Sequence, residues 1–180
     1  MSADFRLFVA LELPGEVRVA LSEWLDAESL SALRPVPPDS LHVTLCFLGS
    51  LPAGEAGAIG DACAGALSNA PAVQLALGEV AWLPRRRPQV LSVAVSDGAG
   101  ELAGVQAAIM AALVAGGWHQ PETRPFFAHI TVGRVRRGEQ VRAVELAGPP
   151  GLSFCGSRVT LFRSHPGSRY EPLATVLLEL

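Results

Sequence analysis

The chain contains no lysine, since all 14 of its basic residues are arginines. This absence excludes every mechanism that needs a lysine side chain, including P-loop phosphate binding, Schiff-base formation and a lysyl-adenylate ligase intermediate. Arginine is well suited to phosphate, because its planar guanidinium matches two phosphate oxygens at once. The net charge of -3 provides no global attraction for nucleic acid, so a polyanion would bind at a local basic patch.

Cysteine and charged residues are also scarce. Three cysteines without a C-x-x-C spacing argue against a disulfide framework or a zinc site and favour reduced thiols in the cytoplasm. The apolar run between Arg6 and Glu12 is too short for a secretion signal or a membrane span. We therefore expect a cytoplasmic protein that does not contact a membrane. With 17% charged and 49% apolar residues, the 180-residue chain fits one compact globular domain.

Two short segments share one pattern: HVTL at residues 42–45 and HITV at residues 129–132. In a strand, successive side chains point to opposite faces. The histidine and the threonine of each segment therefore share one face, and the two aliphatic residues share the other. Nearly half of the chain separates His42 from His129, which is the arrangement expected of a duplicated unit that places one His/Thr pair in each half.

Apolar periodicity predicts the other elements. We expect strands at residues 6–13, 41–48, 73–83, 89–95, 126–135, 152–162 and 173–180, helices at 17–33, 54–69 and 99–115, and a weak, charged helix at 136–146. The proline-rich segment 34–40 is expected to be an extended connector. Because the helices cross between strands of a largely antiparallel sheet, the prediction is an α+β fold with helices outside and the two histidine strands inside.

The two His/Thr pairs suit phosphoryl chemistry. The ordinary pKa of imidazole, about 6.5, lets one neutral histidine activate a water while a protonated one donates to the leaving oxygen. A threonine two positions along places a hydroxyl near a non-bridging phosphate oxygen. The candidate site residues are His42, His129, Thr44 and Thr131. A metallohydrolase is disfavoured, because no Asp or Glu lies near either motif in a ligand pattern, and we expect no metal and no cofactor.

The sequence resembles the RNA 2′,3′-cyclic phosphodiesterase (2′-5′ RNA ligase-like) family of the 2H phosphoesterase superfamily, which is named for its two H-x-T-x motifs. The resemblance covers nearly the whole chain. It includes RLFVALELP near the start, VPPDSLHVTLCFLG and RPFFAHITVGRV around the two motifs, and LFRS with Tyr170 near the end. It implies a bilobal, pseudo-twofold fold in which two mainly antiparallel sheets line a central cleft. Residues 1–180 would then be a single domain of two interleaved lobes.

The resemblance also implies an activity, the opening of a terminal 2′,3′-cyclic phosphate on RNA to a 2′-phosphate without metal or ATP. His42 corresponds to the proton donor for the departing 3′ oxygen and His129 to the base that activates water. Thr44 and Thr131 correspond to hydroxyls that bind phosphate. Arg134 matches an arginine common after the second motif, although its odd offset would turn it away from His129 on a regular strand.

Two residues depart from the family pattern. Cys46 stands where a basic residue often follows the first motif, and Phe127 stands where a polar or basic residue often precedes the second. Both reduce the positive charge near the cleft, which leaves the affinity for RNA and the preferred length open.

Several alternatives remain at this level. The same chemistry suits a small cyclic nucleotide or a 2′-5′ oligonucleotide, and microscopic reversibility allows 2′-5′ ligation of RNA ends. A non-catalytic RNA-end-binding module is a different class, which the presence of all four motif residues disfavours. We expect a monomer whose partners are RNA ends or small cyclic phosphates.

Overall fold

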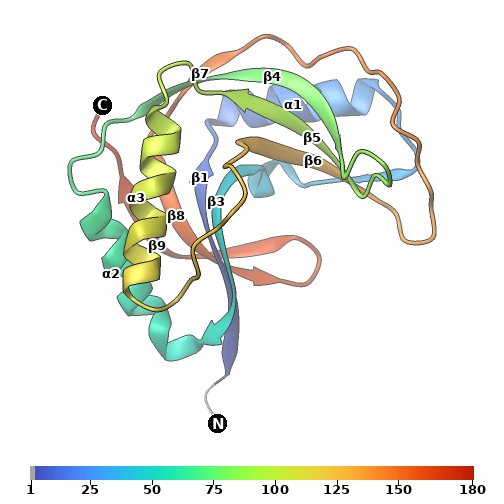
Figure 1. Ribbon diagram of the computed structural model, residues 1–180. Coiled ribbons are helices and arrows are strands. Elements are labelled where there is room, and N and C mark those ends of the chain that lie inside the picture. The colour runs from blue at the N-terminus through green and yellow to red at the C-terminus, as the bar shows by residue number, and fades with distance from the viewer. Residues whose placement is uncertain (1–2) are drawn as a thin grey trace.

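The computed structural model describes residues 3–180. Within that range, nine strands form one antiparallel sheet that curls around the middle of the molecule (Figure 1). The strands are β1 (Asp4–Glu12), β2 (Leu33–Pro35), β3 (His42–Pro52), β4 (Val73–Leu83), β5 (Val90–Ser96), β6 (His129–Val135), β7 (Ser153–Gly156), β8 (Arg158–His165) and β9 (Arg169–Leu177). The helices are α1 (Gly15–Ala27), α2 (Ala56–Ala66) and α3 (Glu101–Ala115), with short 3₁₀ turns at Pro38–Ser40 and Ala53–Glu55.

The two motif strands are neighbours at the centre of the sheet. The strand order is β7-β4-β5-β6-β3-β1-β8-β9, and β2 pairs with β6 outside this path. β3 and β6 meet at the pair Val43 and Ile130, which are both fully buried. The α+β class is confirmed. The two sheets expected from the sequence are instead parts of one sheet, because this central pairing joins strands β3, β1, β8 and β9 to strands β6, β5, β4 and β7.

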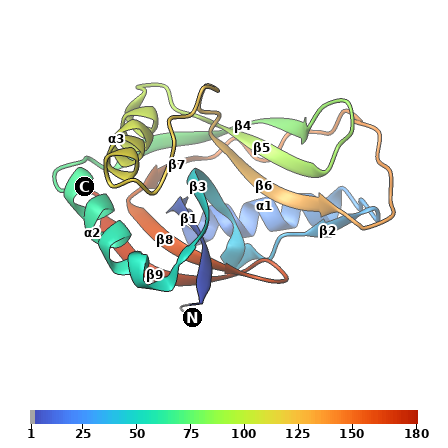
Figure 2. The ribbon, with the colours of Figure 1, turned by 60° about the horizontal axis from the view of Figure 1, so that its bottom comes forward.

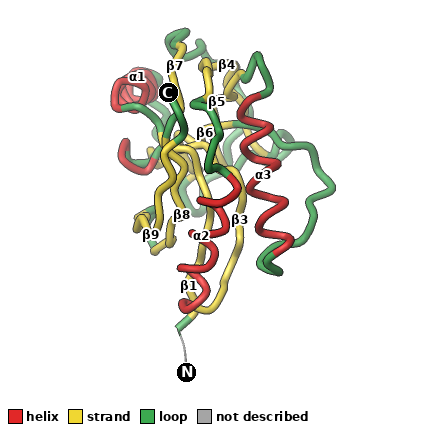
Figure 3. The backbone as a smooth tube through the Cα atoms, turned by 90° about the vertical axis from the view of Figure 1, so that its left-hand side faces the viewer, coloured by secondary structure: helices red, strands yellow, loops and turns green. Residues whose placement is uncertain are grey.

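The helices cover the outer face of the curled sheet and leave the motif strands on the inside (Figure 2). Along one flank α2 and α3 lie side by side, with α1 set apart from them (Figure 3). α1 packs against β6 and α3 packs against β3, so each motif strand is supported by a helix from the other half of the chain. The core between these layers is apolar; for example, α3 buries Leu102, Val105, Ile109 and Leu113 at helical spacing.

The expected helix at 136–146 is wrong, because residues 136–152 form neither helix nor strand. Two buried tryptophans hold this segment through its backbone: the indole N–H of Trp24 donates to the Ala147 carbonyl at 3.0 Å and that of Trp82 to the Val144 carbonyl at 2.9 Å. These bonds satisfy the indoles when the rings are buried, and they take carbonyls that a helix would use. The predicted strand 152–162 is also divided, with β7 and β8 separated at Ser157.

The described part of the chain includes no helix that is both long and apolar enough to cross a membrane.

Candidate active site

One cleft of about 490 Å³ contains both sequence motifs. Its walls include His42 and Thr44 from β3, and His129, Thr131 and Arg134 from β6. All five residues predicted from the sequence therefore line the same hollow. A cleft of this volume is in the usual range for a small organic ligand.

Arg134 reaches the cleft because β6 is irregular. The pairing between β5 and β6 skips one residue at Val132, which is a β-bulge. Val132 and Gly133 are buried one after the other, so the alternation of faces shifts by one position. Arg134 therefore lines the cleft together with His129, five residues earlier. A regular strand would have turned Arg134 away from His129, and the bulge is the reason that it faces the cleft instead.

β3 has the same irregularity at the same distance from its histidine. Its pairing with β1 passes from Thr44 to Cys46 while β1 advances by one residue. Leu45 and Cys46 are buried in succession, and Phe47 lines the cleft. Phe47 thus occupies in the first motif the position that Arg134 occupies in the second.

Cys46 belongs to the core rather than to the cleft. It is 2% exposed, and burial raises the pKa of its thiol to about 12. Its thiol therefore remains protonated at neutral pH and packs as a small apolar group, without the thiolate character that a nucleophile needs.

The two catalytic candidates are oriented by the same backbone contact. Nδ1–H of His42 donates to the carbonyl of Ser40 at 2.7 Å, and Nδ1–H of His129 donates to the carbonyl of Phe127 at 2.8 Å. Because a carbonyl oxygen can only accept, the proton of each neutral ring lies on Nδ1 and leaves Nε2 free to gain or lose a proton. Nε2 of His42 lies 3.0 Å from Oγ1 of Thr44.

The environments of the two rings differ. The His42 ring centroid lies 5.0 Å from that of Phe8 and 5.3 Å from that of Tyr170. The pKa of His42 is lowered to about 4, mainly by burial and to a smaller extent by the charges of Arg134 and His129, while the hydrogen bond to Ser40 acts in the opposite direction. His42 is therefore neutral at pH 7 in the free protein. An anion bound in the cleft would raise its pKa, because opposite charge favours the protonated form.

Sequence reasoning missed the residues that support the motifs. Ser40 holds His42 through its carbonyl, and its hydroxyl donates to the carbonyl of Ser168 at 2.8 Å, in the β8–β9 turn that lines the cleft. Ser92 is fully buried, with its hydroxyl 3.4 Å from that of Thr131. Ser92 had a signal in the sequence, since it is the one polar residue in the apolar run at 90–95.

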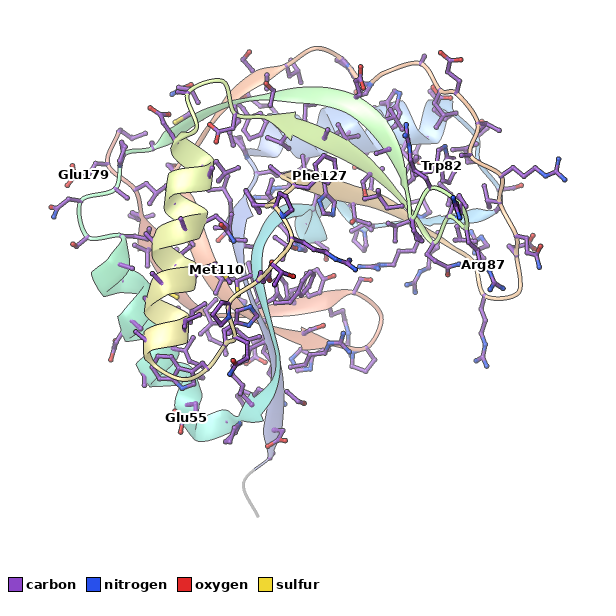
Figure 4. The ribbon with its side chains drawn as sticks, in the orientation of Figure 1. Glu55, Trp82, Arg87, Met110, Phe127 and Glu179 are labelled. Atoms are coloured by element: carbon purple, nitrogen blue, oxygen red, sulfur yellow. The ribbon has the colours of Figure 1, made fainter. Side chains whose placement is uncertain are left out.

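Other candidate groups lie outside the cleft or do not form a site. Arg85, Arg86 and Arg87 are exposed at the tip of the β4–β5 hairpin, where Arg87 is labelled in Figure 4. Phe127, also labelled there, stacks on His129 with ring centroids 5.2 Å apart and remains 48% exposed. Among residues 3–180, no group of three or more His, Cys, Asp or Glu side chains could hold a metal ion.

Comparison with known proteins gives a consistent result. Residues 15–167 match the model of the 2′-5′ RNA ligase superfamily. The chain is 32% identical to the RNA 2′,3′-cyclic phosphodiesterase of Escherichia coli (strain K12), over 96% of each chain. The crystal structure of E. coli LigT complexed with 3′-AMP has a TM-score of 0.82 at 28% identity, covering 98% of this chain and 99% of that one.

A second solved structure, from Thermus thermophilus, has a TM-score of 0.72 at 28% identity and covers 96% of this chain and 97% of that one. The family model covers far more than half of the sequence, and the E. coli relative matches nearly from end to end. The fold, the paired motifs and these matches together show that the chain belongs to the 2′-5′ RNA ligase superfamily.

Proposed function

We propose that this protein hydrolyses the terminal 2′,3′-cyclic phosphate of RNA to a 2′-phosphate, with His42 and His129 as the acid–base pair. One observation carries the proposal: a single cleft contains two imidazoles whose Nδ1–H groups are each bound to a backbone carbonyl, so that Nε2 is the nitrogen of each ring that can take up or release a proton. The activity in the name of the E. coli relative supports the same substrate class.

In the proposed reaction, Nε2 of His129 removes a proton from water, and the water oxygen attacks phosphorus. The bond between phosphorus and the 3′ oxygen breaks, and Nε2–H of His42 gives its proton to that oxygen. The phosphate stays on the 2′ oxygen. At the end of the reaction His129 is protonated and His42 is neutral. Each positioned acid or base of this kind contributes about 10²- to 10⁴-fold to the rate.

The remaining site residues bind the phosphate in this proposal. The hydroxyls of Thr44 and Thr131 and the guanidinium of Arg134 line the cleft beside the two imidazoles. Hydrogen bonds from a guanidinium to phosphate oxygens are charge-assisted and stronger than neutral ones. The anionic phosphate also raises the pKa of His42, which must be protonated to act as the donor.

The cleft also suits a smaller substrate. A volume of about 490 Å³ is in the range of mononucleotide sites, and a related structure contains 3′-AMP. Hydrolysis of nucleoside 2′,3′-cyclic phosphates is therefore the second candidate activity, carried out by the same residues.

We further propose that the protein acts as a monomer in the cytoplasm, where its three free cysteines stay reduced.

The test is to incubate the purified protein with an oligoribonucleotide that ends in a 2′,3′-cyclic phosphate, in excess chelator, and to identify the product isomer by chromatography. We expect turnover to survive the chelator, because two imidazoles suffice for the proton transfers, and the product to be the 2′-phosphate. A 3′-phosphate product would reverse the donor and base assignments. Loss of turnover that a divalent ion restores would refute the mechanism.

Thr44→Val and Thr131→Val are each expected to lower kcat/KM by about tenfold or more, because a hydrogen bond to a charged group contributes about 1.5–3 kcal/mol. Valine suits a strand and nearly matches the shape of threonine, so both variants should remain folded, which thermal unfolding checks. The control is Thr175→Val, which removes the hydroxyl of a threonine on β9 outside this cleft. Steady-state kinetics compares the rates of the two motif variants with that of the control. Wild-type rates in both motif variants would contradict a role in phosphate binding.

A further inference from the structure

Phe127, labelled in Figure 4, stacks on the histidine that the proposed function assigns as the base. The two ring centroids are 5.2 Å apart and the two planes are inclined by only 17°. Among residues 3–180, His129 has no other aromatic partner. Phe127 nevertheless remains 48% exposed, so filling the core does not explain a large apolar side chain at this position.

The stacked ring covers His129 from outside the cleft. His129 lines the cleft, whereas Phe127 does not. The cleft side of the imidazole therefore stays open to a substrate, and Phe127 would not touch a phosphate bound between the two histidines. Any effect of Phe127 on the reaction has to pass through His129.

Ser40 occupies the equivalent position in the first motif. Ser40 and Phe127 each lie two residues before a motif histidine, and each accepts the Nδ1–H of that histidine through its backbone carbonyl, at 2.7 Å and 2.8 Å. Such a carbonyl can orient an imidazole only if its own residue is fixed. Ser40 is fixed by its side chain, because its hydroxyl donates to the carbonyl of Ser168 at 2.8 Å.

The side chain of Phe127 cannot form a bond of that kind, and residues 121–128 form neither helix nor strand. The ring of Phe127 stacks on the imidazole instead. Phe127 and His129 are thus joined twice, by the stacked rings and by the hydrogen bond from Nδ1–H to the carbonyl. Each contact restrains the other, because a Phe127 ring that cannot turn away keeps its carbonyl in line with Nδ1.

We propose that Phe127 is the positioning residue of His129: it directs Nε2 into the cleft and stabilises the imidazolium that forms when His129 takes a proton from water. The inference rests on the proposed function and adds a residue to its mechanism. An aromatic face within about 6 Å of a cation attracts it, and the neutral imidazole lacks this attraction. The stack therefore stabilises His129 more after proton transfer than before it, and interactions of this kind lower a reaction barrier.

The first test measures kcat and KM for a nucleoside 2′,3′-cyclic phosphate. Phe127→Ala should lower kcat by about two- to 30-fold, the range of one cation–π contact, and leave KM unchanged. Phe127→Tyr, which retains the aromatic face, should keep the wild-type rate, whereas Phe127→Leu, which retains only apolar bulk, should not. Val19→Ala, an apolar residue of similar exposure on α1, is the control. Wild-type kcat in Phe127→Ala or Phe127→Leu, or a loss confined to KM, would overturn the inference.

The second test needs no turnover, so it separates this inference from the proposed function. The nitrogen chemical shifts of the His129 ring report which nitrogen carries the proton, and their loss in His129→Gln assigns them. The neutral ring should hold its proton on Nδ1 in the wild type and on a mixture of both nitrogens in Phe127→Ala. The ring C–H protons of His129 should also move downfield in Phe127→Ala, because a stacked aromatic ring shields them.

Unchanged His129 resonances in Phe127→Ala would overturn the inference. A wild-type protein that shows these differences from Phe127→Ala but no turnover would refute only the proposed reaction, and Phe127 would stand as the residue that orients His129.

Discussion

Replacing His42 or His129 by alanine is expected to lower kcat/KM for a 2′,3′-cyclic phosphate by about 10²- to 10⁴-fold, the usual contribution of one positioned acid or base. Both imidazoles line one cleft, and the backbone carbonyls of Ser40 and Phe127 hold their Nδ1–H groups, so each ring is positioned for proton transfer through Nε2. Kinetics and thermal unfolding of the purified variants check the result. A folded His42→Ala protein with the wild-type rate would refute the mechanism.

The same pair predicts the pH profile. One imidazole must be charged and the other neutral, so kcat/KM of the wild type should follow a bell-shaped curve whose two limbs belong to the coupled pair. His129→Ala should remove the acidic limb, because no base remains to be protonated. His42→Ala should remove the basic limb, because no acid remains to lose its proton.

A substrate with a better leaving group assigns the roles. Bis(p-nitrophenyl) phosphate releases p-nitrophenolate, which leaves without receiving a proton. If His42 is the acid, His42→Ala should lose much less activity on this ester than on the cyclic phosphate, whereas His129→Ala should lose activity on both. The opposite pattern would exchange the two roles. This comparison is needed because a bell-shaped profile is the same whichever histidine carries the proton in the free protein.

The wild-type protein is expected to lose about 2 kcal/mol of unfolding free energy between pH 7 and pH 5 through His42 alone. Burial lowers the pKa of His42 to about 4 in the folded chain, against 6.5 for an ordinary histidine. Below pH 6.5 the unfolded chain therefore binds a proton that the folded chain does not, and stability falls as the pH falls. The loss is complete, at about 3 kcal/mol, once the pH is below the folded pKa.

Urea unfolding of wild type and of His42→Gln at both pH values measures this effect. The variant lacks the titrating ring, so its stability should fall by about 2 kcal/mol less than that of the wild type over the same interval. Titration of the His42 ring by NMR gives an independent value. A ring that titrates near pH 6.5, or equal losses in both proteins, would contradict the burial of His42 against Phe8 and Tyr170.

The sequence alone was sufficient for the α+β class, most element positions and the placement of the motif residues in one cleft. These features depend on local patterns, because alternation along a strand sets which face His42 and Thr44 share, and apolar spacing sets which helix face is buried. The repeated motif also indicated that His129 and Thr131 would repeat the arrangement on a second strand. Such information is present within a few residues of each position.

Tertiary structure decided the rest. The bulges at Val132 and in β3 bring Arg134 and Phe47 into the cleft, and they are visible only in the pairing with neighbouring strands. The lowered pKa of His42 likewise depends on Phe8 and Tyr170, which are distant in sequence but pack against its ring.

The single sheet and the irregular segment 136–152 have the same kind of cause. The pairing of Val43 with Ile130 joins two sets of strands, and the indoles of Trp24 and Trp82 bind carbonyls of a segment whose own charges favoured a helix. Alternation and periodicity describe a chain by itself, whereas register, burial and hydrogen-bond partners are set by whichever segment lies next to it in the folded molecule.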